Sequence, residues 1–138
     1  RDGQSLELLA VQVADVDFNG QSLDEFHARH SHFQRCNFAG AELYGADFSN
    51  ALLEECDFSA AILTKANFYG AEISQCRFDG ANLIQAEFIE VSIRHSAFDR
   101  SDLSGGVVSE CRLQGVSFVD AKLGGVHVED GDNEIVAD

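Results

Sequence analysis

Three closely spaced histidines are the first residues in this sequence that could do chemistry. His27, His30 and His32 have the spacing i, i+3, i+5, and imidazole nitrogens are common ligands of Zn²⁺ and Ni²⁺. They form a weak candidate, because the repeat described below directs all three outward onto two adjacent faces, away from any cysteine thiolate. We therefore predict no metal site.

The four cysteines, Cys36, Cys56, Cys76 and Cys111, show no CxxC spacing, which argues against zinc and thioredoxin-like chemistry. The first three are evenly spaced, so the repeat described below stacks them in one inward column. Stacked parallel side chains have poor torsional geometry for a disulfide. We predict buried free thiols, which suit a reducing cytoplasm. The sequence has no apolar run of about 18 residues, so it predicts no membrane span.

No arrangement of residues in the sequence points to catalysis. Asp-Phe-Ser and Gly-Ala-Glu recur because the repeat recurs, and the Gly105–Gly106 pair is not followed by the helix that a phosphate loop needs. The sequence therefore predicts a protein that is not an enzyme and has no cofactor.

A period of five residues organises almost the whole chain. Counting blocks such as CNFAG (residues 36–40), the third place is a large apolar residue in 24 of 25 blocks whose centres run from Leu8 to Val128. The first place is mostly Ala or Cys, so both places must point inward, while the other three are polar. Gly or Asn often ends a block, where a tight turn needs a permissive backbone. Neither a helix nor a strand has this period, which is typical of a solenoid.

Residues 20 apart form columns of a single type, so four blocks make one coil. The two clearest core columns are Phe18, Phe38, Phe58, Phe78, Phe98, Phe118 and Leu23, Leu43, Leu63, Leu83, Leu103, Leu123.

The pattern resembles that of the pentapeptide-repeat family, A(D/N)LXX, in segments such as AGAEL, GANLI and SDLSG. The resemblance covers residues 6–130 and implies an all-β fold, a right-handed quadrilateral parallel β-helix of about six coils spaced by about 4.8 Å. We expect a single domain over residues 1–138, in which residues 131–138 form an acidic C-terminal tail.

The net charge of −15 comes from 24 acidic and 9 basic residues, which favours basic partners and disfavours nucleic acid and anionic membranes. One face is the most acidic, with a net charge of −6 once Arg29 is counted. Its acids, the predicted partner-binding residues, are Glu7, Asp47, Glu87, Glu90, Glu110, Glu129 and Asp130.

Apolar residues at outward places form a second candidate interface. Contiguous apolar patches on a surface tend to be interaction sites. The residues are Tyr44, Ile62 and Ile84 on one face, and Tyr69 and Ile89 on its neighbour.

Two functions remain open. Some members of the family, the Qnr-like and mycobacterial quinolone-resistance proteins, are acidic rods that mimic DNA and bind DNA gyrase and topoisomerase IV. The resemblance therefore implies an acidic protein-binding rod of this kind, although the chain lacks their apolar C-terminal helix and the Qnr loops. The alternative is a structural or adaptor module, a spacer or docking domain with another protein partner. The open ends of a β-helix also predict end-to-end stacking of two copies into a homodimer.

Overall fold

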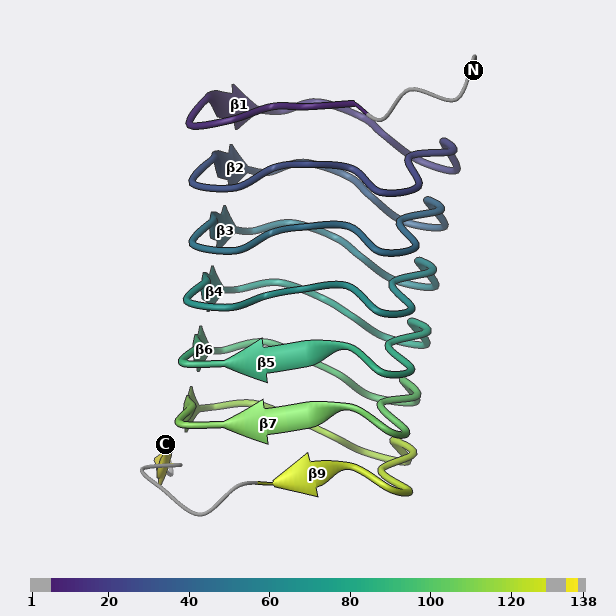
Figure 1. Ribbon diagram of the computed structural model, residues 1–138, viewed down its shortest axis with the longest axis vertical. Helices are drawn as coiled ribbons and strands as arrows, with labels where there is room; N and C mark the ends of the chain where they lie inside the picture. The colour runs from purple at the N-terminus through teal and green to yellow at the C-terminus, as the bar shows by residue number, and fades with distance from the viewer. Residues whose placement is uncertain (1–5, 129–133, 137–138) are drawn as a thin grey trace.

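The computed structural model describes residues 6–128 and 134–136, and these form a stack of parallel coils. Figure 1 shows the coils one above another, with β1 at one end of the rod and β9 at the other. Every element among the described residues is a strand or an isolated bridge, and none is a helix. The predicted parallel β-solenoid is confirmed.

Two parallel sheets run along the rod. The first has seven strands, β1 (Gln12–Ala14), β2 (His32–Gln34), β3 (Leu52–Glu54), β4 (Glu72–Ser74), β6 (Ser92–Arg94), β8 (Arg112–Gln114) and β10 (Glu134–Val136). The second has three, β5 (Glu87–Ile89), β7 (Val107–Ser109) and β9 (His127–Val128). From β1 to β9, paired residues of neighbouring strands lie four blocks apart, as when Val13 pairs with Phe33 and Phe33 with Leu53.

The last strand departs from this register. Ile135 of β10 pairs with Leu113 of β8, so the step between these two strands is longer than four blocks. β10 lies within residues 131–138, the segment that the sequence analysis treated as a tail, and it adds a further strand to the larger sheet.

The interior is apolar, and one column of phenylalanines sets the spacing of the coils. The rings of Phe38, Phe58 and Phe78 stack with centroids 4.8 Å apart and planes within 3° of parallel. These rings are fully buried, as are Leu43, Leu63 and most of the other block centres. Packing is looser where the stack ends: Phe18 and Phe118 are partly buried. Leu123, assigned to the core from its column, is 52% exposed because the structure places no described coil over it.

In the block 26–30 the first place, which is usually small, holds Phe26, and the third place, which is usually large, holds Ala28. Both side chains are fully buried. The Phe26 ring lies among Phe18, Phe33, Phe38 and Phe48, at centroid distances of 5.9 to 6.3 Å. The backbone keeps its register here, since His27 bridges to Glu7 on one side and Asp47 on the other. The exchange therefore conserves core volume without a bulge.

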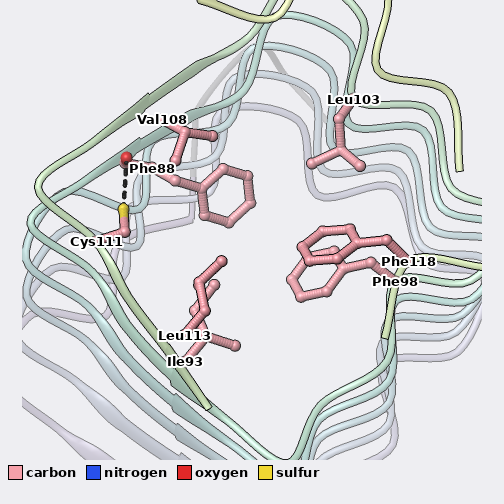
Figure 2. A pocket seen from close by; sticks show the side chains of 8 residues that line it. All are labelled: Phe88, Ile93, Phe98, Leu103, Val108, Cys111, Leu113 and Phe118. Atoms are coloured by element: carbon pink, nitrogen blue, oxygen red, sulfur yellow. Dashed lines mark hydrogen bonds between the residues drawn. The ribbon is translucent and has the colours of Figure 1, made fainter. Parts of the chain in front are cut away.

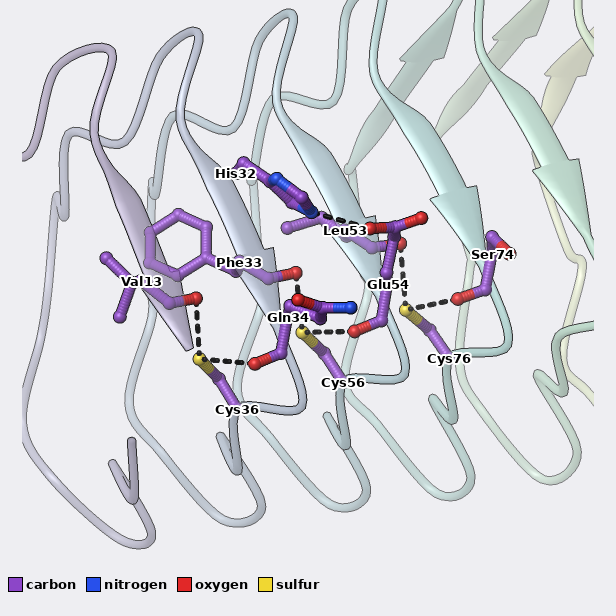
Figure 3. A network of polar contacts seen from close by, with 10 residues as sticks. All are labelled: Val13, His32, Phe33, Gln34, Cys36, Leu53, Glu54, Cys56, Ser74 and Cys76. Carbon is purple, nitrogen blue, oxygen red and sulfur yellow. Dashed lines mark hydrogen bonds and ion pairs between the residues drawn. The ribbon is translucent and has the colours of Figure 1, made fainter. Parts of the chain in front are cut away.

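The coils turn through two kinds of corner. At most corners the N–H of the next block's first residue donates to the carbonyl of the preceding centre, as from Ala41 to Phe38 at 3.0 Å. At four corners that follow a strand, those after β1, β2, β3 and β5, the carbonyl of the centre accepts a hydrogen bond from a thiol of the next coil, as Phe33 does from Cys56 Sγ at 3.4 Å. Figure 3 shows this arrangement repeated by Cys36, Cys56 and Cys76. Each of these thiols also donates to the carbonyl of the residue two positions before it in the sequence.

The predicted state of the cysteines agrees with the structure: all four are buried and free of disulfides. Burial raises the pKa of Cys36 and Cys111, partly offset by backbone N–H groups of the preceding coil. A hydrogen bond with Cys76, together with burial, raises the pKa of Cys56. The thiols of Cys36, Cys56 and Cys111 are therefore neutral hydrogen-bond donors at physiological pH.

Candidate protein-binding face

We call the side of the rod that carries blocks 6–10, 26–30, 46–50, 66–70, 86–90 and 106–110 the acidic face. Of the acids predicted to lie there, the structure describes Glu7, Asp47, Glu87, Glu90 and Glu110. Glu129 and Asp130 lie outside the described residues. The outward direction of these side chains follows from the inward burial of the block centres, such as Phe48, Phe68 and Phe88.

Three carboxylates gather on the C-terminal half of this face. Glu87 begins β5, while Glu90 and Glu110 occupy corners with φ of +56° and +54°, one coil apart. All three side chains are exposed. Among the described residues, no basic side chain lies within ion-pair distance of any of them. Their negative charge is therefore available to a partner.

The N-terminal half of the face differs from the sequence expectation. Arg29 Nε lies 3.7 Å from Asp47 Oδ2. The other Asp47 oxygen accepts hydrogen bonds from the Ser49 N–H at 3.0 Å and from the Ser49 hydroxyl at 2.5 Å. The Asp47 carboxylate is thus engaged in a turn and in an ion pair. The unpaired negative charge of the acidic face therefore lies toward its C-terminal end.

Tyr69 brings an aromatic ring to the same part of the face. Its side chain is 41% exposed, and Ile89 lies one coil further along, with the Gly70 N–H donating to the Ile89 carbonyl at 2.8 Å. A hydrogen bond to the Glu90 carboxylate, with the negative charges of Glu90 and Glu110, raises the pKa of Tyr69. The phenol and the acids therefore form one interacting group.

The remaining residues of the predicted apolar interface lie on a different side. Tyr44, Ile62 and Ile84 belong to the face whose centres are Leu43, Leu63 and Leu83, and they alternate between its second and fourth places. Lys65 Nζ lies 5.9 Å from the centroid of the Tyr44 ring. The five apolar residues thus form two groups, and only Tyr69 and Ile89 lie among the unpaired acids.

The three neighbouring histidines do not converge. His27 takes part in the backbone bridges described above, whereas His32 Nε2 lies 2.5 Å from Glu54 Oε1 on the seven-stranded sheet (Figure 3). Over residues 6–128, no three His, Cys or carboxylate side chains are grouped as a metal ion would require. The same part of the chain contains no helix long and apolar enough to cross a bilayer.

A polar cluster that the sequence did not predict lies on the face whose centres include Phe78 and Phe98. Asp79 Oδ2 accepts from Arg77 at 3.1 Å and from Arg100 at 3.4 Å, and its other oxygen is buried without a partner. Asp99 nearby accepts from the Ser117 hydroxyl and the Val119 N–H. Asp79 and Asp99 share one column of the repeat, which could have indicated the cluster, but the pairing depends on side-chain conformation. The two arginines neutralise this cluster.

The interior offers only apolar space. A hollow of about 30 Å³ lies near the C-terminal end of the core, and Figure 2 shows the side chains that line it. It is lined by Phe88, Ile93, Phe98, Leu103, Val108, Cys111, Leu113 and Phe118. A larger hollow of about 420 Å³ continues from it toward Gly106, Leu123 and Val126. The only polar side chains buried in the described residues are serines, so the interior has no charged group for catalysis.

The repeat itself identifies the family, because the coil of four blocks is now seen in the structure as well as in the sequence. The family profile for pentapeptide repeats (8 copies) matches residues 14–50, 41–80 and 70–105. The chain belongs to the pentapeptide-repeat family. Among curated proteins, none matches it by sequence.

Solved structures of other pentapeptide-repeat proteins share the fold. Rfr23 from the cyanobacterium Cyanothece 51142 is 17% identical with a TM-score of 0.68, and the match covers 94% of this chain and 91% of that one. A protein from the Arabidopsis thaliana thylakoid lumen is 31% identical with a TM-score of 0.65, over 69% of this chain and 66% of that one. QnrB1, a plasmid-mediated fluoroquinolone resistance protein, is 20% identical over 90% of this chain and 94% of that one. Its TM-score is 0.26, so this last match supports no argument about fold or function.

Proposed function

We propose that this chain is a non-enzymatic protein-binding rod that presents carboxylates to a basic surface of a partner. The observation that supports this most is the group formed by Glu87, Glu90 and Glu110, three exposed acids without a basic neighbour among the described residues. They are fixed to a backbone whose coils pair on both sides, so little conformational entropy is lost when a partner binds.

A more specific form of this proposal is mimicry of DNA toward a type II topoisomerase, DNA gyrase or topoisomerase IV, with quinolone resistance as a consequence. Its support is physical: a groove that holds DNA is basic, and a rigid rod with a net charge of −15 offers it negative charge. The pairing of Asp47 with Arg29 restricts the proposed contact to the C-terminal half of the acidic face. Charge of this sign also disfavours direct binding to nucleic acid or anionic membranes.

The second candidate is a structural or adaptor module. The continuous register of four blocks per coil favours it, as do the exposed apolar side chains at both ends of the stack, Leu9 and Val16 at one end and Val119 and Leu123 at the other. End-to-end stacking of two copies would cover them. In either function, four buried thiols suit a reducing compartment, and we propose the cytoplasm.

A supercoiling assay with DNA gyrase distinguishes these functions. We expect the protein to inhibit supercoiling, or to protect the enzyme from a quinolone, and we expect E87Q/E90Q/E110Q to lose that effect. The matched control E42Q/E55Q/E72Q removes the same charge from exposed acids on other sides and should retain the effect. Inactivity of the parent protein at about 10–100 μM, far above the Kd of a specific complex, would exclude the topoisomerase and leave the adaptor function. Equal loss in both triple variants would show that only net charge matters.

A further inference from the structure

We propose that the C-terminal half of the acidic face is a docking site for a basic amphipathic α-helix of a partner protein, laid along the axis of the rod. This inference rests on the proposed protein-binding function and specifies the element that is bound. The docking site consists of Tyr69, Glu87, Ile89, Glu90, Val107 and Glu110.

An apolar strip runs along the middle of this site. Tyr69 and Ile89 occupy the same column in successive coils, and Ile89 pairs with Ser109 in the next strand. Val107 lies beside this column, and its partners in the parallel sheet are Glu87 in the preceding coil and His127 in the next. The strip therefore spans successive coils, with the half-exposed Tyr69 ring at one end, and aromatic rings are frequent anchors in protein interfaces.

Carboxylates flank the column of Tyr69 and Ile89 on both sides. Glu87 occupies the second place of its block, in the column that it shares with Val107, whereas Glu90 and Glu110 occupy the corners beyond the fourth place. The ligand that complements this arrangement has an apolar stripe with Lys or Arg on each side, which is the surface of a basic amphipathic helix. The apolar group of Tyr44, Ile62 and Ile84 does not fit such a partner as well, because Lys65 places a positive charge over Tyr44.

The spacing of the coils favours a helix over an extended peptide. Successive coils are 4.8 Å apart, as measured between stacked phenylalanine rings. One turn of an α-helix rises about 5.4 Å, so side chains at i, i+4 and i+7 meet successive coils within about 1 Å. In an extended strand, side chains on one side repeat at about 6.7 Å, which falls out of step by the second coil.

The test uses a synthetic probe with the full chain. A fluorescent peptide of about 18 residues, with Leu at i, i+3, i+4 and i+7 and Lys elsewhere, forms a basic amphipathic helix of about five turns. A second peptide of the same composition alternates Leu and Lys, which favours an extended strand. Binding is measured by fluorescence anisotropy at about 0.15 M salt, where non-specific charge attraction is screened beyond about 8 Å.

We expect the helical peptide to bind at least about tenfold more tightly than the alternating peptide. Tyr69→Ser with Ile89→Ser should weaken binding of the helical peptide by about tenfold or more, a loss of about 1.4 kcal/mol, since aromatic anchors often dominate the binding energy of an interface. The matched control, Tyr44→Ser with Ile62→Ser, changes the other apolar group and should leave affinity unchanged. Thermal melts verify that each variant is folded, and methyl chemical shifts of Ile89 and Val107 locate the peptide on the parent protein.

The possible failures can be told apart. If both peptides bind equally and only E87Q/E90Q/E110Q weakens them, the site recognises charge alone: the helix inference is wrong and the proposed function stands. If neither set of variants changes the affinity, or the shifts of Ile89 and Val107 stay constant at saturation, this half of the face is not the binding surface and both proposals are overturned.

Discussion

The corner cysteines show how single side chains adapt a regular coil to two kinds of corner. Each of the four cysteines begins the block after a strand, where its thiol donates to carbonyls that the tighter corners satisfy with a backbone N–H. Blocks that follow the tighter corners mostly begin with alanine, as at Ala41, Ala61 and Ala81. At these four corners the first residue therefore supplies both a larger buried side chain than alanine and a hydrogen bond to a carbonyl of the preceding coil.

We predict that Cys76→Ala destabilises the fold by about 1–2 kcal/mol, because it removes a buried sulfur together with its hydrogen bonds to the carbonyls of Leu53 and Ser74. Cys76→Ser should cost less, since Ser96 occupies the same column and donates to the Arg94 carbonyl at 2.9 Å. Urea unfolding of the three proteins measures the difference. Equal loss for Ala and Ser would show that the hydrogen bonds contribute nothing beyond volume.

The raised thiol pKa values predict a loss of stability in alkali. A thiol whose pKa is higher in the folded than in the unfolded chain favours folding below the unfolded value, 9.0 for Cys36, and this contribution disappears as the pH rises toward the folded value. The free energy of unfolding should therefore fall from about pH 8 to about pH 10. In a variant with all four cysteines changed to Ser, the fall should be smaller; an identical fall would assign it to other groups.

At the scale of the element, every corner depends on a left-handed residue. The fifth place of each block from Ala10 to Gly125 has a positive φ, and 16 of these residues are not glycine. Asp or Asn at the second place supports many of the tighter corners, as when Asn67 Oδ1 accepts the Tyr69 N–H at 2.9 Å. Backbone strain is thus repeated along the chain, and close packing between coils compensates for it.

Gly80→Ala isolates this strain. Gly80 has a φ of +67°, and a Cβ there would meet no atom within 4 Å, so the substitution should cost about 1 kcal/mol through the backbone alone. Gly124→Ala is the control, because its Cβ also meets nothing within 4 Å and its φ is not left-handed. Urea unfolding should show a loss for Gly80→Ala only. A similar loss at both positions would contradict the explanation.

The columns of the core could be predicted from the sequence, but the corners could not. Core columns follow from the chemistry of Phe38, Phe58 and their equivalents, which must be buried whatever the corner geometry. The outward places are mostly polar at both kinds of corner, so the pattern of polarity does not distinguish them. The pairing of Arg29 with Asp47 was also missed, because side chains on adjacent coils choose among several partners once the backbone is fixed.

At the scale of the whole molecule, acidic charge opposes folding. The net charge is −15, and the described residues form few ion pairs. Repulsion between like charges reaches about 30 Å at about 0.01 M salt but only about 10 Å at about 0.1 M. We predict that the melting temperature rises between these salt concentrations. The rise should be smaller for E87Q/E90Q/E110Q, which lacks three of the repelling charges, and a melting temperature that falls with salt would show that attractive pairs dominate.

The constant step of four blocks per coil also limits how genes for such a rod can gain or lose sequence. Deleting four consecutive blocks shortens the rod by one coil and returns every later residue to its own side. Deleting one block rotates everything downstream onto the neighbouring side, which sets leucines beneath phenylalanines. If that block lies between Tyr69 and Glu87, the deletion also turns Glu87, Glu90 and Glu110 away from Tyr69. Related rods should therefore differ in length by whole coils, so that their length varies in evolution while the direction of each surface is inherited unchanged.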